Sequence, residues 1–173
     1  MTEGLIVFPI MMMAIVACIE FSYGMFQWNQ AAKAMQLGVR RAVVRDKLTT
    51  DFDTVFVFNS SLGGTVVAPN AARVSRCGAG YGACNAAALT PLVTYMQSFN
   101  SKIEAANLRI TYQHNGLGYE GRPSGPVVTL RMELINLPLD LPFIGKFITM
   151  TGITFPPFPV TATTEDLKTA SGS

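Results

Sequence analysis

The first part of the chain carries an almost unbroken run of apolar side chains. Between Glu3 and Lys33 the only charged residue is Glu20. A helix needs roughly 20 mostly apolar residues to cross a bilayer core of about 30 Å. Residues 5–28 meet this requirement, and their apolar side chains lie all around a helix instead of forming one stripe. The pattern therefore predicts a membrane-spanning helix.

Two other structures could account for such a segment. A helix buried in a soluble core can be apolar on all sides, but the remaining chain of about 140 residues is too short to enclose it. A cleaved signal peptide begins with basic residues and ends at a small-residue site, whereas the segment before the apolar run contains Glu3 and no clear cleavage site follows. We therefore expect the helix to act as a membrane anchor.

The helical pattern continues beyond the apolar run, because apolar residues recur at helical spacing opposite polar ones. One continuous helix over 5–47 would be roughly 65 Å long. Pro9 is expected to kink this helix or to mark its first turn. The aromatic rings of Tyr23 and Trp28 are expected near the far membrane interface, where aromatic side chains are favoured.

After residue 49 the pattern becomes that of a small α+β domain. Segments rich in alternating or β-branched residues predict short strands, at 54–58, 65–68, 108–113, 128–135 and 160–164. A helix is expected over 91–106, with Thr90 as its cap and Pro91 in its first turn. Residues 75–88 are interpreted as a glycine-rich loop, and the proline-rich residues 138–159 as mostly irregular.

These elements predict an α+β fold in which a long N-terminal, pilin-like helix packs on a small antiparallel sheet with a second helix. Residues 1–28 are expected to form the transmembrane anchor, and residues 29–48 its amphipathic continuation. Residues 49–173 are expected to form the α+β domain outside the cytoplasm.

Composition argues against several classes of function. Only 14% of the residues are charged and the net charge is +2, which disfavours a disordered chain and a charge-driven nucleic-acid binder. One histidine and three cysteines leave little material for a metal site or a Cys/His catalytic centre. His114 is interpreted as a surface residue, and neither a nucleophile elbow nor a dinucleotide fingerprint is found. We expect no enzyme activity, cofactor, metal ion or small-molecule substrate.

Cys77 and Cys84 bracket a short segment of Gly, Ala and Tyr. This spacing, with flexible glycines between, can close a small disulfide loop, whereas the paired C-x-x-C units of zinc ribbons are absent. A disulfide implies an oxidising compartment, and the alternative is two free thiols in a cytosolic loop. Cys18 lies in the apolar run and is interpreted as a small hydrophobic residue.

Glu3 and Glu20 lie near opposite ends of the apolar run, about 25 Å apart along a helix. A carboxylate inside a membrane segment is costly, and it usually pairs or has a function. The alternative for Glu20 is a side chain that extends to the membrane interface. The alternative for Glu3 is an ordinary solvated acid.

Four motifs in the N-terminal half carry a resemblance to known proteins. Residues 3–9 (EGLIVFP) resemble an entry motif with a fixed spacing from Glu to Pro, and 19–21 (IEF) resemble the acidic residue that ends the apolar run. Residues 30–34 (QAAKA) and 38–42 (GVRRA) resemble a helix of small residues ending in Gly-x-Arg-x-Ala. Together they resemble TadE-like proteins, which are pseudopilin or minor-pilin components of tight-adherence (Tad) pilus systems. The similarity is specific over 3–45 and weaker beyond.

The resemblance implies a structural protein that supports assembly of a Tad-type pilus through packing of N-terminal helices. Glu3 matches the family's glutamate, which is important for processing or for subunit assembly. With Pro9 and Glu20 it makes up the candidate assembly residues. Family precursors carry a short basic leader before this glutamate, which would add positive charge on the N-terminal side.

We expect a single-pass protein of the inner, or cytoplasmic, membrane, whose domain faces the periplasm or cell exterior. Incorporation of the protein in a pilus is compatible with this location. The positive-inside rule alone favours the opposite orientation, because the basic residues follow the helix. The cysteine pair and the leader's charge favour the outside. The expected partners are the bilayer and other pilin or pilus-assembly subunits, with self-association and without nucleic acid.

Two alternative functions remain open from the sequence. One is a membrane-anchored extracytoplasmic binding or adhesion module with ligand contacts in the loops 59–64 and 115–125. The other is a membrane-tethered hydrolase, although the sequence contains no recognisable set of catalytic residues.

Overall fold

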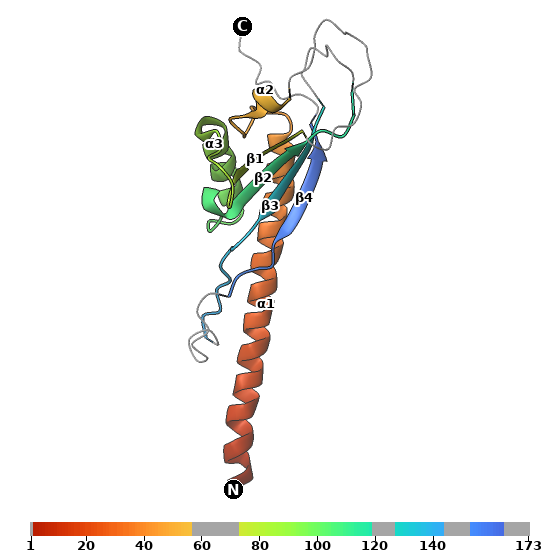
Figure 1. Cartoon of the computed structure of the whole chain (residues 1–173). Helices are drawn as coiled ribbons and strands as arrows, with labels where there is room; N and C mark the ends of the chain where they lie inside the picture. The colour runs from red at the N-terminus through yellow and green to blue at the C-terminus, as the bar shows by residue number, and fades with distance from the viewer. Residues whose placement is uncertain (1, 57–72, 119–126, 144–152, 165–173) are drawn as a thin grey trace, which may run out of the picture.

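The computed structural model describes residues 2–56, 73–118, 127–143 and 153–164, with side chains from residue 7 onward. A long helix, α1, extends well beyond a small domain that contains one sheet (Figure 1). The elements in chain order are α1 (Thr2–Ala42), α2 (Phe52–Val55), β1 (Val74–Gly78), α3 (Ala86–Gln97), the 3-10 turn η2 (Ala105–Asn107), β2 (Leu108–Gln113), β3 (Thr129–Leu134) and β4 (Phe158–Thr163). The predicted α+β class, with a long N-terminal helix and an antiparallel sheet, is confirmed.

Helix α1 is continuous over 41 residues, which corresponds to about 60 Å. Its N-terminal half projects away from the domain, whereas its C-terminal half lies along the sheet (Figure 1). The helix ends at Ala42, before the predicted end at Lys47, and Arg40 and Arg41 lie in its last turn, where positive charge is favourable. Pro9 lies inside α1, beyond its first turn, so the expectation that it marks the first turn is wrong.

The four strands form an antiparallel meander in the order β1-β2-β3-β4. The apolar residues of β2 and β3 are between 0% and 2% exposed. Their register pairs Leu108 with Leu134, Ile110 with Met132 and Tyr112 with Leu130. Because side chains alternate along a strand, this pairing gives one apolar face, which shares a single core with α1 and α3.

Helices α1 and α3 approach each other closely at Gly38. A Cβ atom at position 38 would lie 2.8 Å from the Sδ atom of Met96, whose side chain is fully buried in α3. Met35 and Val39 bury their side chains in the same core. The glycine therefore permits a helix contact that a larger residue would disturb.

The strand predicted at 54–58 is wrong where the structure describes it, because Phe52–Val55 form the short helix α2. Phe52 and Phe56 are both buried, and their ring centroids lie 4.7 Å apart. Residues four apart meet on one side of a helix, so a helical turn brings the two rings into contact and buries both. In a strand the two rings would lie further apart. The predicted partner strand at 65–68 lies outside the described residues.

The loop predicted over 75–88 is wrong in its first part, which belongs to β1. The alternation in this strand buries Ser75 and Cys77. Gly78 ends the strand with a φ of 93°, and a Cβ there would lie 2.2 Å from the carbonyl oxygen of Leu108. The glycine-rich stretch after it makes the turn toward α3.

The second helix begins earlier and ends earlier than predicted over 91–106. Asn85 caps α3, since its side chain accepts a hydrogen bond of 3.2 Å from the N–H of Ala87. The alanine run that follows is strongly helix-favouring, so Pro91 lies inside α3 and Thr90 is not the cap. The helix ends at Gln97, and η2 leads separately into β2.

Strand β4 begins at Phe158, before the predicted start at Val160. It is an edge strand, and Pro159, which lacks an N–H, is tolerated there. The described residues before it, 138–143 and 153–157, form no regular element beyond one bridge between Pro138 and Thr154, in agreement with the irregular segment predicted.

Candidate functional site

The N-terminal half of α1 exposes a large apolar surface. The stretch Val7–Ala42 contains a window of mean hydropathy 1.8, of which 6% is buried, so it is long and apolar enough to cross a membrane. Between Val7 and Phe26 most of its large apolar side chains, such as Phe8 and Phe21, are 42% to 73% exposed, and Val16 is half-buried. Contiguous exposed apolar surface of this extent marks a contact with lipid or with another protein.

Glu20 lies where the described part of the domain packs against the apolar run of α1. Its side chain is only 2% exposed, and its carboxylate accepts a hydrogen bond from the backbone N–H of Phe143. The side chain is therefore covered by protein, and the alternative in which it extends to the membrane interface does not describe this structure.

Gln27, two helical turns after Glu20, binds the same segment of the domain. Its Nε2 donates to the carbonyl oxygen of Asp140 at 3.0 Å, and its Oε1 accepts from the N–H of Asp140 at 3.2 Å. Glu20, Gln27 and the backbone of 140–143 are termed here the α1 clasp. The clasp fixes an otherwise irregular segment along the helix by hydrogen bonds to its backbone.

Two chain segments run side by side at the clasp, and they are termed here the arms (137–143 and 153–157). The N–H of Leu139 donates to the carbonyl of Ile153, and the N–H of Phe155 to that of Leu137, each at 2.9 Å. In Figure 1 the arms leave β3 and β4 and follow α1 toward its N-terminus. The domain thus reaches down the helix beyond its own core.

A groove of about 490 Å³ lies between α1 and the arms. Its lining is apolar except for Glu20, and it consists of Ala17, Glu20, Phe21, Gly24, Met25, Trp28, Leu139, Leu141, Phe155 and Pro156. Trp28 stands at one end, with its ring centroid 5.2 Å from that of Phe155 and 4.7 Å from that of Phe158. Trp28 therefore packs on the domain as well as lying near the end of the apolar run.

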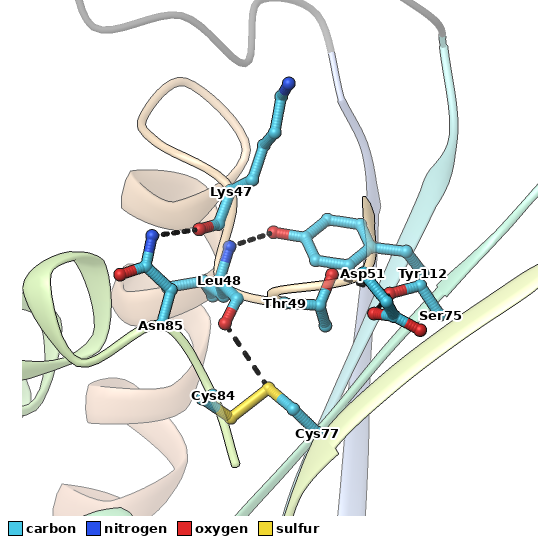
Figure 2. Close-up of a disulfide and its surroundings, with 9 residues drawn as sticks. All are labelled: Lys47, Leu48, Thr49, Asp51, Ser75, Cys77, Cys84, Asn85 and Tyr112. Carbon is cyan, nitrogen blue, oxygen red and sulfur yellow. Dashed lines mark hydrogen bonds between the residues drawn. A yellow bond between two sulfur atoms is a disulfide. The ribbon is translucent and has the colours of Figure 1, made fainter. Parts of the chain in front are cut away.

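Cys77 in β1 and Cys84 before α3 lie at disulfide-bonding distance, with their sulfur atoms 2.01 Å apart (Figure 2). The segment that leaves α1 rests against this pair. The carbonyl oxygen of Leu48 accepts from the N–H of Asn85 at 2.8 Å and lies 3.4 Å from the sulfur of Cys77. A sulfur in a disulfide has no proton, so this last contact is a van der Waals contact in the oxidised form. The cysteine pair thus joins β1 to α3 beside the end of α1.

Two titratable side chains are buried at the C-terminal end of β2, where Tyr112 belongs to the strand and His114 follows it. Burial raises the pKa of Tyr112 well above its usual value, and the Leu48 N–H that donates to its hydroxyl at 3.4 Å opposes this only partly. His114 is 1% exposed, so the interpretation of it as a surface residue is wrong. Burial, and next the charge of Arg73, lower the pKa of His114 and keep its imidazole neutral. Both groups are buried, and neither lines the groove beside α1.

The predicted site residues do not form one cluster. Glu20 lies in the groove, and Pro9 lies on the exposed part of α1. The side chain of Glu3 lies outside the described residues. Gln27 was missed by the sequence analysis, although a second polar residue on the same face of an apolar helix was a signal that could have identified it. Within the described ranges, no group of three or more His, Cys, Asp or Glu side chains could hold a metal ion.

Comparison with curated proteins and with solved structures gives no match. The family described as TadE-like protein matches residues 2–40, which is nearly the whole of α1 and includes both side chains of the clasp. The resemblance found in the motifs of the N-terminal half is thereby confirmed. Over α1 the chain is similar to TadE-like proteins, which suggests a Tad pilus-associated protein with an N-terminal apolar helix.

Proposed function

We propose that this protein is a membrane-anchored minor pilin or pseudopilin that supports assembly of a Tad-type pilus. The observation that carries the proposal is the exposed apolar half of α1, which is the same helix that matches the family. The domain leaves this half uncovered, so it needs an apolar environment. The bilayer supplies that environment before assembly, and the helices of other subunits supply it afterwards.

The proposed location is the inner membrane, with residues 1–28 as the single span and residues 49–173 in the periplasm or outside the cell. The bonding distance between Cys77 and Cys84 supports this orientation, because disulfides persist in oxidising compartments. The interactions proposed are with lipid, with pilus subunits and with further copies of the chain. Enzyme activity, a cofactor and nucleic-acid binding are not part of the proposal.

The candidate assembly residues have different roles in this proposal. The carboxylate of Glu20 is engaged within the chain, so it positions the arms. Glu3 acts between subunits: an unpaired carboxylate in an apolar environment is penalised, and pairing with a neighbour's N-terminal amine would fix the register of adjacent helices. Pro9 shapes the exposed part of α1 between them.

The test is pilus assembly by full-length variants in cells that lack the wild-type protein. Glu3→Gln removes the charge and keeps the shape, and it is expected to reduce surface pili while the protein remains in the membrane fraction. Asp46→Asn, an equivalent change at an exposed residue after α1, is the control and is expected to assemble normally. If Glu3→Gln assembles as well as wild type, the pairing role is wrong. If alkaline washing releases the wild-type protein from membranes, the anchor is wrong.

The alternative of a binding or adhesion module places ligand contacts in the loops 59–64 and 115–125. Except for 115–118, these residues lie outside those that the structure describes. No contact in the described part favours this alternative over pilus assembly. Binding of a cell-surface ligand by the protein when pilus assembly is blocked would be the observation that supports it.

A further inference from the structure

We propose that the groove between α1 and the arms binds one acyl chain of a membrane lipid. The inference rests on the proposed anchoring of α1 in the bilayer. The groove holds about 490 Å³, within the range of about 300–1,000 Å³ that is typical of small-molecule sites. Its lining is apolar apart from Glu20, whose carboxylate is already hydrogen-bonded to the N–H of Phe143.

The position of the groove along α1 matches the depth of one leaflet. Its helix residues run from Ala17 to Trp28, about 16 Å along the axis, which is half of a hydrocarbon core of about 30 Å. At one end lie Gln27 and the ion pair between Lys102 and Asp140, which are suited to the polar headgroup region. At the other end α1 continues with exposed, mostly apolar side chains over residues 7–15. The groove therefore opens where acyl chains are.

The backbone of the arms is suited to this depth. Peptide groups near the hydrocarbon region must be paired, since no water is present there to replace a missing hydrogen bond. The N–H groups of Leu139 and Phe155 are bonded across the arms, that of Asp140 to Gln27, and that of Phe143 to Glu20. The clasp thus pairs the buried carboxylate with part of the irregular backbone, and it leaves apolar surface facing the groove.

An acyl chain fits this groove better than a helix of a second subunit. A helix with its side chains is about 10 Å across, much wider than an extended acyl chain. The mouth of the groove is bordered by Phe21 and Met25, which are 71% and 46% exposed and belong to the proposed lipid-facing surface of α1. Because these two residues belong to both, the lipid that covers this surface of α1 also has access to the groove. A slender apolar chain is the occupant that fills the volume without needing a hydrogen-bond partner.

Trp28 is the only tryptophan of the chain and lines the groove, so its fluorescence reports on the occupant. The full chain is reconstituted in phosphatidylcholine vesicles, with unlabelled acyl chains or with acyl chains that carry bromine, a short-range quencher. Wild type is expected to be quenched strongly by the brominated lipid. Gly24→Leu fills the groove from α1 and is expected to lose about half of that quenching, because the added side chain takes the volume beside Trp28.

Gly24→Ala is the matched control, because a Cβ at position 24 would make an ordinary contact of 3.6 Å with Leu139 and leave the groove open. It is expected to be quenched like wild type. Quenching by acrylamide from the aqueous side should stay equal in all three proteins, which shows that Gly24→Leu has not exposed the indole to water.

Equal quenching by brominated lipid in all three proteins would overturn the inference, because Trp28 would then simply face bulk lipid. Absence of quenching in proteins that float with the vesicles would also overturn it, and it would leave the anchoring of α1 intact. Failure of the wild-type protein to float with vesicles would instead remove the proposed anchor, on which this inference rests.

Discussion

The substitution Gln27→Leu tests whether the α1 clasp holds the arms on the helix. Gln27 is 8% exposed, and its amide makes two hydrogen bonds with the backbone of Asp140, at 3.0 and 3.2 Å. Leucine keeps an apolar stem of similar size and removes both bonds. The bond from Phe143 to Glu20 and the contact of Trp28 with Phe155 remain, so the arms should loosen and stay attached to the helix.

The size of the effect follows from the two bonds. Each intramolecular hydrogen bond contributes about 0.5–1.5 kcal/mol net, so the free energy of opening the arms should fall by about 1–3 kcal/mol. A change of about 1.4 kcal/mol in the free energy of opening changes the equilibrium constant for opening tenfold. Amides in the arms should therefore exchange about 5- to 150-fold faster. The amides of β2, in the centre of the core, should exchange at unchanged rates.

Hydrogen exchange of the full chain in detergent micelles, followed by mass spectrometry, measures both regions in one sample. Gln36→Leu makes the same chemical change at an exposed position of α1, and it should leave the arms unchanged. Wild-type exchange of residues 139–143 in Gln27→Leu would refute the reasoning. Equal acceleration in the arms and in β2 would also refute it, since the effect would then be on global stability.

Three further predictions concern the domain. Reduction of the Cys77–Cys84 pair should lower the free energy of unfolding by about 2–3 kcal/mol, as expected for so short a loop. Denaturation with and without reductant should show this difference. A tryptic peptide that carries two blocked thiols would contradict the disulfide. Gly38→Leu should lower the free energy of unfolding by about 1–3 kcal/mol, because the added side chain overpacks against Met96. Adding Met96→Ala should recover part of this loss. Equal stability of Gly38→Leu and wild type would disprove the close contact. The pKa of His114 is lowered by burial and by Arg73, so the unfolded chain takes up a proton more readily than the folded one. The free energy of unfolding should therefore decline as the pH falls below about 6.5. His114→Gln should flatten this decline, which denaturation curves at several pH values would show.

Elements with a strong local period were predictable from the sequence. The bounds of β2 agree with the predicted 108–113, because each apolar residue in it faces the core and each polar one faces away. The apolar run of α1 likewise identified the surface that the domain leaves uncovered. Period and length are properties of a single segment, so they can be recognised without knowledge of the rest of the chain.

Elements whose structure depends on distant contacts were not predictable. Residues 52–56 suit either a strand or a helix locally, and burial of Phe52 against Tyr112, with ring centroids 5.1 Å apart, favours the helical turn. The start of α3 was misplaced because Thr90 and Pro91 are a strong local signal, whereas the true cap, Asn85, also binds the carbonyl of Lys47. The clasp joins residues 113 positions apart, through a segment with no period.

The two attachments of the domain to α1 have a mechanical consequence. The core packs on the helix from Ala31 to Ala42, and the clasp binds it at Gln27 and Glu20, so the contacts extend over about 33 Å of the axis. A body held on a rod at one point can pivot, whereas a body held at two separated points cannot tilt without breaking one of them. The angle between the sheet and the axis of α1 is thereby set by the chain itself, and a pull along α1 is shared between an apolar contact and a pair of hydrogen-bonded side chains.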